Sequence, residues 1–190
     1  YSSEVATLAS AGGDAVAVIG YLDQGGKGII QGALDSGSFD TFILSDGMIG
    51  DSLTDAFGND LNKSFGSLPG SMNKKTAGTF TTVAKTAGID SSGPYTGESY
   101  DAAALIVLAM QAGNSADRAS IAKNIMGVAN APGTKIYPGE IKKGLDLLAQ
   151  GKKIDYEGAT GVVFTNVGEA EGSFLEKEIK GGKFKTKKQR

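Results

Sequence analysis

The stretch AVAVIGYLDQGGKGIIQGALDSGSFDTFILSDG, residues 15–47, contains the pattern that determines the fold class. Its first six residues are apolar or glycine and include two valines and an isoleucine, which is typical of a short strand covered on both faces in a parallel sheet. Residues 25–35 follow with apolar side chains at helical spacing, and residues 41–44 form a second apolar run. Strand, helix and strand at this spacing predict a βαβ unit, and therefore an α/β fold with a parallel sheet.

After this unit, the predicted elements no longer alternate between strand and helix. Asp51 is a predicted N-cap for a short helix through Phe57, and a third strand is predicted near Lys63–Leu68, before Pro69 and Gly70. Four helices are then predicted in a row with no strand between them, over residues 72–88, 98–113, 116–129 and 138–150. Two strands are predicted near the end, over Gly161–Thr165 and Ser173–Ile179, and a hairpin turn at Gly181-Gly182.

Composition favours a folded domain outside the membrane. Apolar residues make up 40% of the 190 residues and charged residues 21%, so the chain can bury a core. The longest apolar-rich run, Ala102–Ala109, is less than half of the roughly 20 residues that span a bilayer, so we expect no membrane insertion. No signal peptide begins at Tyr1, and the chain opens in a predicted helix over residues 3–11. We therefore expect a fragment whose targeting sequence and first half are missing.

Charge is unevenly distributed along the chain. The net charge is −2, and the segment Lys180–Arg190 has six basic residues and no acidic one, so the preceding 179 residues carry −8. An acidic body argues against a nucleic-acid partner. The basic segment is a candidate polyanion contact, but a solvated, frayed terminus is the favoured interpretation.

The sequence lacks cysteine, histidine and tryptophan. Thiol nucleophiles, disulfides, Cys/His zinc sites and histidine bases are therefore excluded, and no cofactor is expected. The segment GGKG at residues 25–28 lacks the spacing of a phosphate-binding loop, and Gly28 stands where serine or threonine belongs. Spacing alone leaves a Ser–Lys pair or paired carboxylates open, but no catalytic constellation stands out and we expect no enzyme.

Three segments, in order, resemble the branched-chain amino acid (Leu/Ile/Val) family of type I periplasmic substrate-binding proteins, which serve ABC transporters. The first is AGGDAVAVIGYLDQGGKGIIQGALDSGSFDTFILSDGMIGDS, residues 11–52, and it is similar to the start of that family's second lobe. The second is GPYTGESYDAAALIVLAMQAG, residues 93–113, and the third is IDYEGATGVVFTNVGEAEGSFLEKEIKGGKFK, residues 154–185. Each motif is weakly specific alone, but the three occur in family order over nearly the whole chain. The stretch Ala131–Glu140 departs from the pattern, because it is longer and richer in glycine than expected.

The resemblance implies two Rossmann-like lobes with parallel sheets, of which this chain is the C-terminal part. Residues 1–68 and 168–190 would belong to the C-terminal lobe. Residues 72–165 would supply helices and a strand that pack on the N-terminal lobe, whose own strands would lie in the missing first half. Tyr100 and Asp101 begin the helix near a crossing between the lobes, and capping and packing there are their favoured roles.

The resemblance also implies a ligand site at strand ends, where open α/β sheets bind ligands. Asp46 would accept the ammonium group of an amino acid, although spacing alone favours a simple turn at Ser45-Asp46-Gly47. Tyr21 would lie against the ligand, with a packed or surface aromatic as the equal alternative, and a one-residue shift would place Leu22 there instead. Gly47 and Met48 are weaker candidates, for backbone donors and an adaptable apolar wall. The groups that hold the ligand carboxylate would belong to the missing lobe.

The implied function is capture of a branched-chain or aliphatic amino acid in the periplasm and delivery to the membrane permease of an ABC transporter. The same fold with an amide, urea or aromatic-acid ligand is the first alternative. A ligand-binding domain of a membrane receptor is the second, and no transmembrane helix follows Phe184 to favour it. An enzyme on this fold is the last.

Overall fold

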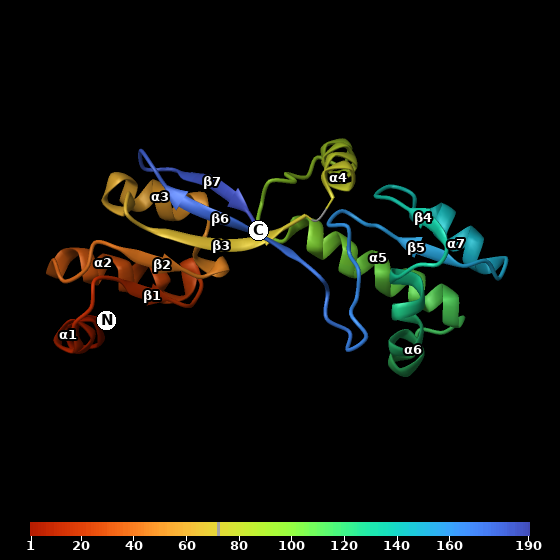
Figure 1. Ribbon diagram of the computed structural model, residues 1–190, viewed down its shortest axis with the longest axis horizontal. Helices are drawn as coiled ribbons and strands as arrows, with labels where there is room; N and C mark the ends of the chain where they lie inside the picture. Colours follow the sequence, from red (N-terminus) through yellow and green to blue (C-terminus); the bar gives the residue numbers. More distant parts are fainter. Residues whose placement is uncertain (72) are drawn as a thin grey trace. The chain divides into compact units, whose positions relative to one another are not determined.

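The computed structural model describes residues 1–71 and 73–190 of the chain, and its elements are mixed α and β (Figure 1). The chain divides into two compact units, which are described separately. Unit 1 comprises Tyr1–Pro69 and Phe174–Arg190, and unit 2 comprises Gly70–Ser173. The prediction that residues 1–68 and 168–190 belong to one lobe of a longer protein, and residues 72–165 to the other, stays a prediction.

Unit 1 is a five-stranded sheet with helices packed against one face. In chain order its elements are α1 (Ser2–Ala11), β1 (Val16–Val18), the kinked turn η1 (Leu22–Gly26), α2 (Lys27–Ser36), β2 (Phe42–Leu44), the 3-10 turn η2 (Asp46–Met48), α3 (Asp51–Phe57), the 3-10 turn η3 (Gly58–Leu61), β3 (Phe65–Gly70), β6 (Ser173–Ile179) and β7 (Phe184–Gln189). The strand order is β1-β2-β3-β6-β7. β1, β2 and β3 are parallel, as the βαβ pattern predicts.

The core of unit 1 lies between this sheet and α1, α2 and α3. Val16, Val18, Phe42 and Leu44 point to the core face, since burial alternates along β1 and β2. α2 adds Ile30 and Ala33, and it ends at Gly37, whose left-handed backbone (φ 64°) closes the helix. Asp51 is the first residue of α3 rather than its N-cap, because Gly50 holds the cap position.

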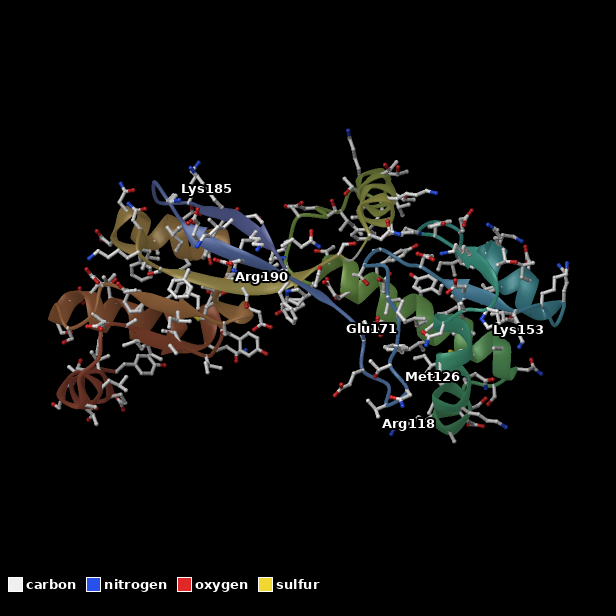
Figure 2. The ribbon with its side chains drawn as sticks, viewed as in Figure 1. Arg118, Met126, Lys153, Glu171, Lys185 and Arg190 are labelled. Carbon is white, nitrogen blue, oxygen red and sulfur yellow. The ribbon has the colours of Figure 1, made fainter. Side chains whose placement is uncertain are left out.

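The C-terminal segment pairs with β6 as strand β7, so the predicted fraying of the basic terminus is wrong, whereas its predicted exposure to solvent is confirmed. The backbone N–H of Arg190 donates to the carbonyl of Phe174 over 2.8 Å, and the Phe174 N–H donates to the Arg190 carbonyl over 2.9 Å. Lys187 and Arg190 also pair with Glu176, whose pKa these two cations hold below its ordinary value. Figure 2 labels Lys185 and Arg190 on this hairpin.

Unit 2 is mainly helical around a small parallel sheet. Its elements are α4 (Lys74–Thr86), α5 (Thr96–Gly113), α6 (Arg118–Ala129), β4 (Thr134–Ile136), α7 (Ile141–Ala149) and β5 (Ile154–Tyr156). All four helices match predicted ones. The prediction that no strand interrupts them is wrong, because β4 lies between α6 and α7 and pairs with β5. The predicted strand over Gly161–Thr165 is also wrong, since that segment forms only one isolated bridge, between Phe164 and Ala170.

A buried carboxylate holds the core of unit 2 together. Asp101 of α5 is 3% exposed and accepts four hydrogen bonds from the last residue of β5 and the segment that follows it. The donors are the Tyr156 hydroxyl (2.9 Å), the Ala159 N–H (2.6 Å), the Thr160 N–H (2.9 Å) and the Thr160 hydroxyl (2.7 Å). Asp101 therefore does not cap α5. It lies within the helix, away from its first residue, and its hydrogen bonds hold residues 156–160 against α5.

Candidate functional site

The candidate site lies in unit 1, where the carboxyl ends of β1 and β2 come together. The two strands pair in register, with Val18 beside Leu44, so the segments that follow them begin side by side. η1 and η2, the turns after the two strands, contact each other. The five residues predicted for the site, Tyr21, Leu22, Asp46, Gly47 and Met48, all lie in or next to these turns.

Ser45 fastens the two strand ends to each other. Its backbone N–H donates to the carbonyl of Val18 over 3.1 Å. Its hydroxyl accepts from the Gly20 N–H over 3.2 Å and lies 3.3 Å from the Gly20 carbonyl, to which it donates. Sequence reasoning did not single out Ser45, although it is the first polar residue after β2. Its contacts fix where Tyr21 and Asp46, the next residue in each segment, leave the sheet.

Tyr21 and Gly47 are in direct contact. A Cβ added to Gly47 would lie 2.5 Å from the Gly20 carbonyl oxygen and 2.8 Å from Cδ1 of Tyr21. Glycine is therefore required at this position for the Tyr21 ring to lie against the η2 turn. The ring is 63% exposed. The structure thus places an exposed aromatic side chain on the backbone of the Asp46 turn.

The side chain of Asp46 is exposed at the start of η2. Its Oδ1 accepts the N–H of Gly47 over 2.8 Å, which orients the carboxylate relative to the turn. The Gly47 N–H is therefore occupied by Asp46. The turn and ligand interpretations of Asp46 are compatible, because an acid that shapes its own turn still presents a negative charge at the sheet edge.

Leu22 and Met48 lie beneath the turns. Met48 is fully buried, and a Cβ on Gly26 would overlap its side chain. The Met48 N–H donates to the Ser45 carbonyl over 3.0 Å. Leu22 is half-buried, packs against the core of unit 1 and lies close to Gly50. Both side chains therefore support the η1 and η2 turns from the core, and only Tyr21 and Asp46 of the five project as exposed side chains.

An exposed carboxylate and an exposed aromatic ring in two turns that contact each other can each attract a cation, and the carboxylate can also accept from N–H donors. Among the described residues, no group of three or more acidic side chains is arranged to hold a metal ion. A groove of about 210 Å³ lies at the opposite edge of the sheet, at the start of β3 next to Phe65. Its two lining acids are already paired, Glu176 with Lys187 and Glu178 with Lys180. None of the helices in the described ranges combines the length and apolar character needed to cross a membrane.

Comparisons with known proteins support the fold. No protein-family model matches the sequence, and no curated protein sequence matches it. Among solved structures, a leucine-binding protein, LivK, from Thermotoga maritima is similar, with a TM-score of 0.66 at 17% sequence identity. The match covers 99% of this chain and 47% of LivK, so the chain spans about half the length of that protein. The α/β fold predicted from the sequence is therefore confirmed, in the form found in a periplasmic binding protein.

Proposed function

We propose that this chain is the C-terminal part of an extracytoplasmic solute-binding protein that captures a small amino acid, branched-chain or aliphatic, for an ABC importer. The similar solved structure is that of a binding protein rather than an enzyme, which supports a binding role. The proposal depends on one observation: Asp46 and Tyr21 are exposed side chains at the ends of two adjacent strands, and Ser45 joins these strand ends. In this proposal two hinged lobes close on the ligand, and the closed form docks on the membrane permease.

The two side chains have distinct roles in this proposal. The Asp46 carboxylate accepts hydrogen bonds from the ligand ammonium, a charge-assisted contact that gains strength once the cleft excludes water. The Tyr21 ring provides a flat apolar surface and also attracts the ammonium through its π-face. The Gly47 N–H stays with Asp46. By the family resemblance, the donors for the ligand carboxylate belong to the part of the protein outside this chain.

The test is calorimetric titration of the longer parent protein with L-leucine, Asp46→Ala and Tyr21→Ala being the test variants. Losing a hydrogen bond to a charged group costs about 1.5–3 kcal/mol, so Asp46→Ala should weaken leucine binding roughly 10- to 100-fold. Asp55→Asn removes an exposed carboxylate of α3 and is the matched control, which should leave affinity unchanged. Unchanged leucine affinity in Asp46→Ala would refute the assigned role.

The same titration separates the ligand classes. Acetamide, urea and benzoate are added in competition with leucine. An amino-acid site should prefer leucine over all three, because only leucine carries the ammonium that Asp46 neutralises. Tighter binding of acetamide, urea or benzoate would refute the amino-acid assignment and keep only the fold.

A further inference from the structure

The hairpin of β6 and β7 is the basic part of an acidic unit. Residues 1–69 of unit 1 contain nine acidic and two basic residues, which gives a net charge of −7. Residues 174–190 contain two acidic and seven basic residues, which gives a net charge of +5. An extended negative surface therefore attracts the hairpin and repels the remainder of unit 1.

Both acidic residues of the hairpin already have basic partners. Glu176 pairs with Lys187 and Arg190, and Glu178 pairs with Lys180. Three further lysines are exposed and take part in no ion pair among the residues that the structure describes: Lys183, Lys185 and Lys188. The positive charge of these three side chains is therefore available to a partner.

These three lysines lie on the turn and the outer strand of the sheet. β7 is last in the strand order, and it carries Lys185 and Lys188. Lys183 lies in the exposed turn between β6 and β7. Lysines on an edge strand discourage pairing with a further strand, which argues against a peptide partner that extends the sheet. Protection of the edge does not account for Lys183, because this residue lies outside the strand.

The three lysines do not enclose a pocket for a small anion. None of them lines the groove of about 210 Å³ next to Phe65. A lysine ammonium is a compact charge that attracts anions without the paired geometry of an arginine side chain. Such exposed, non-directional charges are suited to a surface that carries many negative groups, as a layer of anionic lipid headgroups does.

We propose that the β6–β7 hairpin binds the surface of a membrane that contains anionic phospholipids, and that Lys183, Lys185 and Lys188 contact the headgroups. The pairing of β6 with β7 orders the backbone of these residues before binding, so the entropy cost of ordering a flexible tail is avoided. The acidic remainder of unit 1 disfavours a nucleic acid, which would contact more of the surface. The inference is independent of the ligand at the strand ends, so the leucine titration and the lipid binding can fail separately.

Sedimentation of the 190-residue chain with lipid vesicles tests the proposal. One set of vesicles contains equal parts of phosphatidylglycerol and phosphatidylcholine, and the other contains phosphatidylcholine alone. At low ionic strength, binding to the first set should be at least about tenfold tighter, and added salt should weaken it because exposed charges are screened. Equal binding to the two sets overturns the proposal.

A triple variant tests whether the hairpin is the part that binds. Lys183→Gln, Lys185→Gln and Lys188→Gln together should weaken binding to the anionic vesicles at least about tenfold, because each lysine near such a surface adds to the attraction. None of the three has an ion pair to lose, so the urea midpoint should stay unchanged and show that the variant folds. Unchanged binding by this variant overturns the proposal.

The matched control removes three exposed lysines of unit 2. The triple variant Lys123→Gln, Lys152→Gln and Lys153→Gln changes the net charge by the same amount and should bind the anionic vesicles as the unmodified chain does. An equal loss in the two triple variants overturns the proposal, because net charge alone would then explain the binding. Binding of soluble polyglutamate as tight as that of the anionic vesicles would assign the hairpin to an acidic protein and would also overturn it.

Discussion

Removal of the Asp101 carboxylate should destabilise unit 2 more than any surface charge change. Asp101→Ala leaves the Tyr156 hydroxyl and the N–H groups of Ala159 and Thr160 without their acceptor. A buried donor left without a partner costs about 1–3 kcal/mol, and the losses from donors that share one acceptor are not additive. We therefore expect the free energy of unfolding to fall by about 4 kcal/mol.

The amide variant tests whether charge or only volume matters. Asp101→Asn keeps the size of the side chain but replaces one acceptor oxygen with an NH₂ group, which then faces donors. We expect a loss of about 3 kcal/mol. Asp146→Asn is the control, because Asp146 pairs with Lys142 on the surface of α7 and both side chains are more than half exposed. Such pairs contribute at most about 1 kcal/mol.

The assay is urea unfolding followed by far-ultraviolet circular dichroism, since the chain has no tryptophan. Peptide-level hydrogen exchange over α5 and residues 154–160 assigns the change to unit 2. If both Asp101 variants lose less than about 1 kcal/mol and match Asp146→Asn, the carboxylate does not hold the 156–160 segment and the reasoning from its four hydrogen bonds fails.

Two further predictions concern Tyr156 and Gly47. Burial, reinforced by the negative charge of Asp101, raises the pKa of Tyr156 above its ordinary value of about 10, so the folded protein keeps a proton that the unfolded chain releases. The free energy of unfolding should therefore fall as pH rises above about 10, and Tyr156→Phe should reduce that fall. The measurement is the change in urea midpoint between pH 9 and pH 11. An equal change in the variant and in the unmodified protein would contradict the prediction. Gly47→Ala should lower the free energy of unfolding by about 1–3 kcal/mol, because the added Cβ would lie 2.5 Å from the Gly20 carbonyl oxygen. Gly127→Ala is the control, since Gly127 lies in α6 with open space around it, and it should raise the free energy of unfolding by up to about 1 kcal/mol. Equal urea midpoints for the two variants would show that the η2 turn tolerates a side chain.

Local patterns predicted the elements that have strong periodicity. The apolar runs of β1 and β2, the stripe of α2 and the helices of unit 2 follow from spacing that the backbone geometry imposes. β4 could not be predicted this way, because Thr134–Ile136 is three residues long and begins with two polar ones. It forms because Gly133 lets the chain approach the backbone of Ile154, a contact between segments about 20 residues apart.

The same division applies to the candidate site. Residue order placed Tyr21 and Asp46 after the two strands, but the burial of Met48 depends on Gly26, and the joining of the strand ends depends on Ser45 and Gly20. The two exposed side chains are among the five candidates that the sequence and the family resemblance named, and their role stays a prediction; the supporting contacts could not be predicted.

The sequence by itself determined the α/β class, the parallel βαβ unit and the exclusion of thiol and histidine chemistry, because these depend on composition and on spacing within a few turns or strands. The tertiary structure decided which side chains reach the surface and which polar groups meet. Asp101 accepts a hydrogen bond from Thr160, 59 residues away in the sequence, and Ser45 accepts one from Gly20, 25 residues away. Such pairings are selected by the packing of whole elements, since no local propensity distinguishes a carboxylate that will be buried from one that will face water.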